Sequence, residues 1–447
     1  MKLENDLEND PIKSLVWRIA IPSMVAQFVS VLYSIVDRIY IGNIPLIGDT
    51  ALAGVGVCAP VVTMISAFAS LIGLGGSPLL SMRMGAKKEE EAQKILANSF
   101  LMICICSVFL MAVFFPLREP MLRLFGASDV TYPYADGYFW VYLCGTPFAL
   151  LSVGLNQFII CQGFAKKGML SVVLGAVMNI VLDPIFIFAF DMGVEGAALA
   201  TVISQVVSCA YVLFVLFGKK VQVRITFGGY RFSVARQILA LGFSPFLIIA
   251  IDNVMIIAMN AVLQYYGGGG LGDRLVVCAT IAQSFMLIVT MPLGGISGGT
   301  QTILAYNYGA RQHDRVRQAQ KYILLLCLGF VTLMFVLSRL IGPLFTRLFT
   351  PDVSLQAEAF EAIKIFTLAI LPLGIQYELV DGFTAMGQVK LSLFLSFFRK
   401  FIYFASLFII PIFWGAKAAF FAEPVSDVLG PIVTIVVHRW AIRKILD

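Results

Sequence analysis

The chain is patterned as a series of long apolar segments separated by short polar connections. Each segment has about twenty residues or more, which is the length that an α-helix needs to cross the core of a bilayer. The pattern therefore predicts an all-α polytopic membrane protein with twelve transmembrane helices. They are expected near residues 14–41, 51–82, 94–116, 132–162, 168–190, 195–217, 236–265, 275–306, 318–345, 358–387, 391–411 and 416–440.

Composition and charge agree with this interpretation. The chain is 59% hydrophobic and 13% charged, with a mean hydropathy of +0.90, whereas soluble proteins have about 25% charged residues. The net charge of +6 does not indicate nucleic-acid binding, because the basic residues lie between apolar segments. They are richest in the connections 83–94, 219–236 and 311–321. By the positive-inside rule, we expect a multi-pass protein of the cell (inner) membrane with both termini cytoplasmic.

The sequence also repeats itself at a nearly constant offset. Gly85-Ala-Lys-Lys recurs as Gly309-Ala-Arg-Gln, 224 residues later, and Gly163 with Lys166 recurs as Gly387 with Lys390. Two prolines recur similarly, Pro22 as Pro245 and Pro147 as Pro372. The repeat predicts two parallel six-helix bundles, 1–218 and 236–447, joined by a cytoplasmic linker loop at 219–235. Such duplication is typical of secondary transporters.

One predicted helix, 171–190, carries polar groups at membrane depth. Asn179 and Asp183 are four residues apart, so their side chains share one helix face, and Pro184 is expected to kink the helix. An acid there costs roughly 2.5–3.5 kcal/mol on insertion scales. We interpret the pair as a cation or proton site; the alternative is an acid that only hydrogen-bonds a neighbouring helix.

Several stretches resemble the multidrug and toxic compound extrusion (MATE) family of the MOP exporter superfamily. They are PIKSLVWRIAIPSMVAQFVSVLYSIVDRIYIGN, ALAGVGVCAP and LGGSPLLSMRMGAKKEEEAQK. The resemblance covers nearly the whole chain. It implies a V-shaped pair of bundles around a central cleft, alternating access, and export of drugs or organic cations driven by H⁺ or Na⁺ re-entry.

The resemblance also implies a set of site residues. One branch of the family couples transport through the N-terminal bundle, and this sequence matches its pattern at Asp37, Asn179, Asp183 and Thr201. We expect these residues to carry a proton, or to hold Na⁺ at Asp37, Asn179 and Asp183. In some accounts of the family the first helix bends at a proline, which corresponds to Pro22 here.

Two of these residues have simpler interpretations. Asp37 could be an interfacial acid paired with Arg38, although adjacent residues point to different sides of a helix. The repeat places Asn260 at the position equivalent to Asp37, so only one half keeps the charge. Thr201 could merely bond back to a carbonyl of its own helix.

Acids in the second half form a further candidate charge or substrate site. Asp252, Glu378 and Asp381 lie in predicted helices, and Arg399 and Lys400 interrupt another. Buried opposite charges normally pair, so an internal ion-pair network and a substrate-cation or proton site both remain open.

No other chemistry is favoured. We expect no cofactor beyond the coupling ion, no resident metal, lipid surroundings and a monomer. An intramembrane enzyme is disfavoured because no histidine lies within a predicted helix at a catalytic position. A flippase for lipid-linked oligosaccharides remains the nearest alternative, but it requires a more basic cleft than Arg399 and Lys400 provide.

Overall fold

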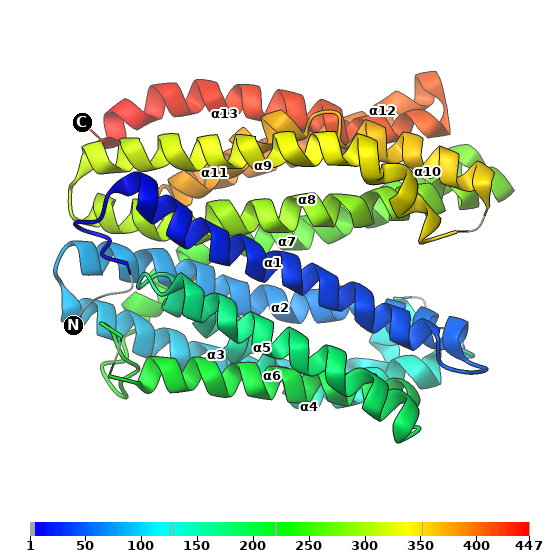
Figure 1. Cartoon of the computed structure of the whole chain (residues 1–447), viewed down its shortest axis with the longest axis horizontal. Coiled ribbons are helices and arrows are strands. Elements are labelled where there is room, and N and C mark those ends of the chain that lie inside the picture. Colours follow the sequence, from blue (N-terminus) through cyan, green and yellow to red (C-terminus); the bar gives the residue numbers. More distant parts are fainter. Residues whose placement is uncertain (1–4, 126, 128, 220, 351, 447) are drawn as a thin grey trace. The chain divides into compact units, whose positions relative to one another are not determined.

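The computed structural model describes residues 5–125, 127, 129–219, 221–350 and 352–446, which are almost wholly helical and contain no strand (Figure 1). The first half comprises α1 (Ile12–Gly42), α2 (Gly48–Gly85), α3 (Glu89–Leu124), α4 (Tyr132–Ile160), α5 (Ala165–Pro184), the π-helical turn η1 (Ile185–Ala189) and α6 (Gly193–Phe217). The second half comprises α7 (Phe232–Gly267), α8 (Gly269–Gly309), α9 (His313–Arg347), α10 (Val353–Phe366), α11 (Ile370–Ala385), α12 (Val389–Trp414), the 3₁₀ turn η2 (Ala416–Phe421) and α13 (Ala422–Leu446).

The helices confirm the predicted polytopic all-α class. Among the described residues, eleven helices are long and apolar enough to cross a membrane, and the bent pair α10–α11 brings the number to twelve if it forms one span. Several helices are longer than the predicted apolar segments because their polar ends continue the helix beyond them. The segment predicted at 358–387 is the exception, since it is broken by a bend of 47°.

Sequence and packing both account for this break. Pro372 lies in the first turn of α11, where its missing N–H is tolerated. Arg339 of α9 donates to the Lys364 carbonyl at 3.0 Å and to the Thr367 hydroxyl at 2.8 Å, which satisfies backbone left open at the end of α10. The equivalent proline in the first half, Pro147, lies inside the continuous helix α4.

The chain divides into two compact units. One contains Ile21–Phe246 and the N-terminal residues up to Asn9; the other contains Asp10–Ala20 and the chain from Leu247 onward. The division therefore falls within α1 and α7 rather than in the loop between α6 and α7. It falls beside Pro22 in one helix and beside Pro245 in the other, the two prolines that the repeat relates.

Backbone geometry supports the sequence repeat directly. Lys87 and Arg311 are non-glycine residues with positive φ, at 59° and 57°, in the turns that follow α2 and α8. Gly163 and Gly387 likewise have positive φ, at 86° and 74°, after α4 and α11. Both pairs are separated by the 224-residue offset, so the same tight turns recur in the two halves.

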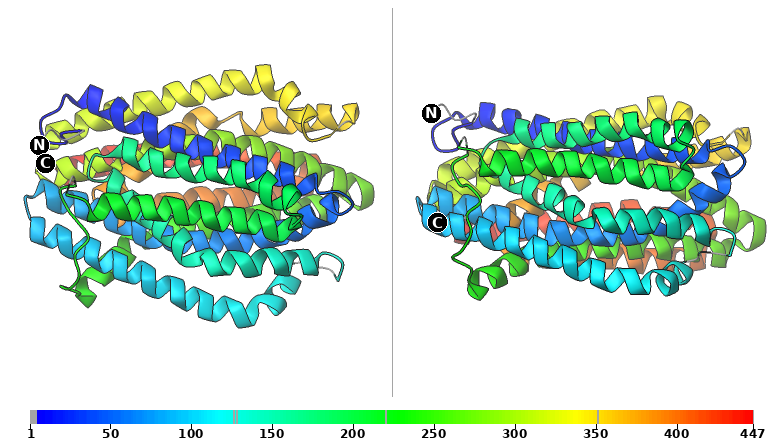
Figure 2. Two further views of the ribbon diagram at one scale, coloured as in Figure 1. Left: turned by 60° about the horizontal axis from the view of Figure 1, so that its bottom comes forward. Right: turned by 90° about the horizontal axis from the view of Figure 1, so that it is seen from below.

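The predicted linker 219–235 is folded against the first unit and is shorter than expected, because α7 begins within it. The Gln162 side chain forms two hydrogen bonds with the backbone of Val223, donating to its carbonyl at 3.0 Å and accepting from its N–H at 2.8 Å. Val223 is buried, and Asn98 accepts from the N–H of Arg231 at 3.1 Å. Figure 2 shows this green segment near the end of α6.

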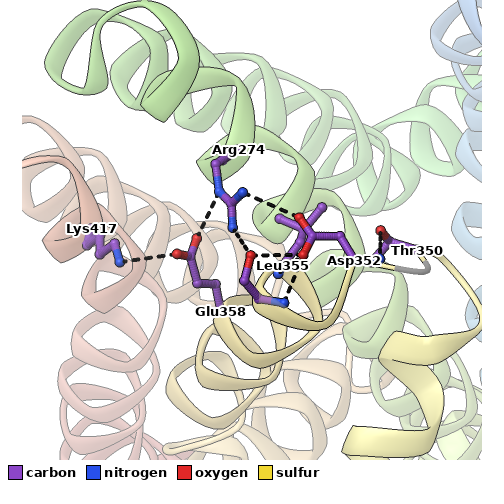
Figure 3. A network of polar contacts seen from close by, with 7 residues as sticks. Arg274, Thr350, Asp352, Leu355, Glu358 and Lys417 are labelled. Atoms are coloured by element: carbon purple, nitrogen blue, oxygen red, sulfur yellow. Dashed lines mark hydrogen bonds and ion pairs between the residues drawn. The ribbon is translucent and has the colours of Figure 1, made fainter.

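A polar network joins the start of α8, the start of α10 and η2 (Figure 3). Arg274 donates to Ser354 at 2.8 Å and lies 3.4 Å from Asp352 and 3.6 Å from Glu358, which Lys417 approaches at 3.9 Å. Asp352 caps α10, accepting from the Ser354 hydroxyl and backbone N–H, both at 2.8 Å. These hydrogen bonds lower the pKa of the Asp352 carboxyl, so the cap stays ionised at neutral pH.

Candidate ion-coupling site

The central polar pair lies where α5 changes its helical pitch. Asn179 and Asp183 sit in the last two turns of α5, and Pro184 closes that helix before η1 begins. Proline supplies no N–H to the preceding turn, which favours a local change of pitch. Asp183 is 0% exposed and Asn179 is 2% exposed, so the predicted pair is fully removed from solvent.

The structure brings Thr201 of α6 to this pair. The Asn179 amide donates to the Asp183 carboxyl at 3.1 Å and to the Thr201 hydroxyl at 3.3 Å. One amide therefore uses both N–H groups to connect α5 with α6. Thr201 could instead have bonded to a carbonyl of its own helix. No such hydrogen bond from its hydroxyl is found in the described part of the chain.

Asp37 of α1 completes the group. Its carboxyl is close enough to that of Asp183 for the two groups to interact electrostatically. Arg38 is exposed, and no ion pair joins it to Asp37 among the described residues. Two carboxyl groups so close cannot both remain ionised cheaply. A shared proton or a bound cation would remove this repulsion.

Oxygen atoms without hydrogen-bond partners lie in the same group. Oδ1 of Asp37, Oδ1 of Asn179 and Oδ2 of Asp183 are buried and have no hydrogen-bond partner. Buried polar atoms without partners are rare and costly, and hard cations prefer oxygen ligands. No group of three or more His, Cys, Asp or Glu that could hold a metal ion occurs in the described residues. The donor set combines two carboxyls with an amide oxygen, which suits a hard cation or a proton.

Aromatic and polar residues beside this group were not identified from the sequence. Tyr138 of α4 lies near Asp37 and near Tyr33, and it stacks on Tyr142 with ring centroids 6.4 Å apart. Tyr142 lies near Gln205 of α6. The four-residue spacing of Tyr138 and Tyr142 was the available signal, but aromatic residues are too common in this chain for it to stand out.

The predicted acids of the second unit do not form a single group. Lys400 forms an ion pair with Asp252, as one of the two interpretations expected. Glu378 is 1% exposed, and neither of its carboxyl oxygens has a hydrogen-bond partner. Asp381 neighbours Glu378 and lies near Ser297 and Gln301 of α8. Neither acid pairs with Arg399 or Lys400 in the described structure.

Arg399 pairs with an acid that was not identified from the sequence. It pairs with Asp427 of α13 at 2.6 Å, and Asp427 is 0% exposed. Glu423, one turn earlier on α13, is close enough to interact electrostatically with both Arg399 and Lys400. Asp427 was overlooked because α13 begins after the 3₁₀ turn η2, so the helical phase of its acids could not be related to α12.

Comparison with known proteins decides the family. The model of the MatE family matches residues 22–185 and 249–410, which are equivalent stretches of the two halves. The chain belongs to the MatE family. This confirms the resemblance inferred from the sequence, and MATE-family proteins are transporters.

Individual relatives agree over the full length. The multidrug export protein MepA of Staphylococcus aureus (strain MSSA476) is 23% identical over 434 residues, covering 96% of this chain and 94% of MepA. An outward-facing MATE transporter of the MOP superfamily has a similar fold, with a TM-score of 0.92, 24% identity and coverage of 100% and 99%. A MOP superfamily transporter from Pyrococcus furiosus, in which reversed polarity of the binding pocket suggests a different function, has a TM-score of 0.93, 25% identity and complete coverage of both chains.

Proposed function

We propose that this MATE-family chain exports organic cations from the cell in exchange for H⁺ or Na⁺. The observation that carries the proposal is the set of buried, donor-free oxygens on Asp37, Asn179 and Asp183. Full-length similarity to a multidrug export protein supports the drug-like substrate class. The coupling ion would bind in the first unit, where Asp37 of α1, Asn179 and Asp183 of α5 and Thr201 of α6 come together.

The coupling step follows from the change in charge at this site. When Asp37 and Asp183 are both ionised, their repulsion favours separating α1 from α5. A shared proton or a Na⁺ removes that repulsion and allows the two helices to pack together. A ligand shifts such an equilibrium only by its difference in affinity for the two arrangements. Ion entry from outside and ion release inside then expose the substrate site to one side of the membrane and to the other in turn.

Two prolines are suited to absorb the accompanying helix movement. Pro22 and Pro245 lie inside α1 and α7, next to the residues at which each helix passes from one compact unit to the other. A proline inside a helix weakens the hydrogen-bond ladder at that point. We propose that α1 bends at Pro22 when the ion binds.

Separate ion gradients test the proposed function. Proteoliposomes loaded with ethidium, a permanently charged organic cation, are given either an H⁺ gradient or a Na⁺ gradient directed so that re-entry of the ion drives export. We expect at least one gradient to drive ethidium efflux well above the rate from protein-free liposomes. Equal efflux with and without both gradients would exclude coupled antiport.

Orientation in the membrane forms a separate proposal. The connections that are rich in Lys and Arg are expected on the cytoplasmic side of the membrane. This predicts that both termini are cytoplasmic. Phe227 lies in the folded linker and is 73% exposed. In a cysteine-free variant carrying Phe227→Cys, an impermeant thiol reagent is expected to label everted vesicles and spare intact cells. Labelling of intact cells would reverse the orientation.

A further inference from the structure

The segment that joins the two halves carries positive charge without any acid of its own. The chain has no Asp or Glu between Glu195 and Asp252, a stretch that contains the end of α6, the linker and the start of α7. Four basic side chains of this stretch are exposed, and no ion pair joins any of them to a described residue. They are Lys219, Arg224, Arg231 and Arg236.

The other two basic connections differ in this respect. After α2, Arg83 pairs with Glu91 at 3.1 Å, and at the start of α9, Arg317 pairs with Asp314 at 3.7 Å. Those connections therefore neutralise part of their charge within the chain. The linker keeps its positive charge available for an anion that the chain does not supply.

The linker also has a fixed backbone. Val221, Val223 and Ile225 are buried, whereas Arg224 between them is exposed. The Ile225 N–H donates to the Leu216 carbonyl at the end of α6 at 3.1 Å, which adds to the hydrogen bonds that hold Val223. Because the backbone is already ordered, the Arg224 side chain loses less freedom on binding than it would in a flexible loop.

Aromatic rings lie on the same segment. Phe227 packs against Phe100 of α3 and Phe217 of α6, with ring centroids 6.1 Å apart in both cases. Phe227 is nevertheless 73% exposed, and Tyr230 and Phe232 are 45% and 85% exposed. Exposed rings next to basic side chains are typical of protein surfaces that lie in the membrane–water interface.

We propose that this surface binds the headgroup of an anionic phospholipid of the inner leaflet. We call the linker surface the side chains of Arg224, Phe227, Tyr230, Arg231 and Phe232. Guanidinium groups match the geometry of a phosphate, and the rings would lie beside the glycerol and the upper acyl chain. A soluble anion would use the arginines but not the rings. A zwitterionic lipid supplies its own positive charge, so the linker surface should prefer a lipid with net negative charge.

The proposal is independent of the proposed transport function. Only the leaflet follows from the proposed orientation, since the basic connections are expected on the cytoplasmic side. Lipid binding to purified protein requires neither an ion gradient nor a substrate. Absence of coupled efflux would therefore contradict the proposed function and leave the linker surface untouched.

Native mass spectrometry of the detergent-purified full-length protein tests the linker surface. The protein is titrated with phosphatidylglycerol or with phosphatidylcholine, and the affinity for the first bound lipid is compared. We expect the wild type to bind phosphatidylglycerol at least tenfold more tightly. Arg224→Gln and Arg231→Gln should each lower this preference about fivefold, the contribution typical of one basic residue near an anionic lipid surface. Arg317→Gln is the matched control and should keep the wild-type preference, because Arg317 is already paired with Asp314.

The design separates loss of the site from loss of the fold. Both linker arginines are exposed, and Arg231 bonds to Asn98 through its backbone N–H, which glutamine retains. An unchanged preference for phosphatidylglycerol in the folded double variant Arg224→Gln, Arg231→Gln would overturn the proposal. Glycerol 3-phosphate at a concentration equal to that of the lipid provides a second test. It should leave phosphatidylglycerol bound, and full displacement would show a site for a soluble anion instead of a lipid.

Discussion

Asp183→Asn is expected to reduce gradient-driven efflux to the rate of protein-free liposomes while leaving the protein folded. The amide has the size and shape of the carboxyl and can still accept the hydrogen bond that Asn179 donates at 3.1 Å. It cannot ionise, so it imitates the neutralised site permanently. The variant should therefore keep one arrangement of α1 against α5 and lose the alternation that coupling requires.

Two further substitutions test whether the loss of efflux is specific to Asp183. Asn179→Ala removes a neutral ligand and leaves both carboxyls, so we expect weaker but measurable coupled efflux. Asp191→Asn is the matched control, since Asp191 is an exposed acid just beyond η1 in a left-handed backbone conformation that asparagine tolerates. It should transport at the wild-type rate. Wild-type efflux by folded Asp183→Asn would exclude Asp183 from the coupling site.

Arg399→Met is expected to cause the largest loss of folded protein. It removes the partner of Asp427, which is fully buried. Breaking a buried ion pair from one side typically costs about 3–5 kcal/mol, because the remaining charge is left uncompensated. That is a large share of the 5–15 kcal/mol by which proteins are usually stable.

A double substitution separates charge from packing. Arg399→Met with Asp427→Leu removes both charges and keeps apolar volume, and it should recover most of the lost stability. Thermal unfolding of detergent-purified protein provides the measurement. If the single variant is as stable as the wild type, the pair does not hold α12 to α13 in the way that the geometry implies.

The sequence predicted the fold class because bilayer thickness and helix rise leave few alternatives for long apolar segments. It could not predict the break between α10 and α11. That break depends on Arg339, which lies on another helix and supplies the donors for the Lys364 carbonyl and Thr367. It also could not show that the linker is held by Gln162 and Asn98, since these bonds join residues far apart in the chain.

The candidate sites were also predictable from the sequence only in part. Asn179 and Asp183 were predictable as neighbours because four-residue spacing places them on one helix face. Placing Asp37 and Thr201 beside them required the family resemblance, as no periodicity relates α1 to α5 or α6. Arg399 was expected to pair with an acid of α7 or α11, and it pairs with Asp427 of α13 instead. Partner choice of this kind depends on helix packing, which local sequence does not specify.

Ion release on substrate binding tests the coupling site most directly. Purified protein near neutral pH is mixed with ethidium in weakly buffered solution containing a pH indicator, and Na⁺ displacement is followed in parallel. We expect the wild type to release close to one H⁺ or one Na⁺ per ethidium bound. Asp183→Asn should bind ethidium and release neither ion. The same stoichiometric release from Asp183→Asn would contradict coupling at the oxygens of Asp37, Asn179 and Asp183.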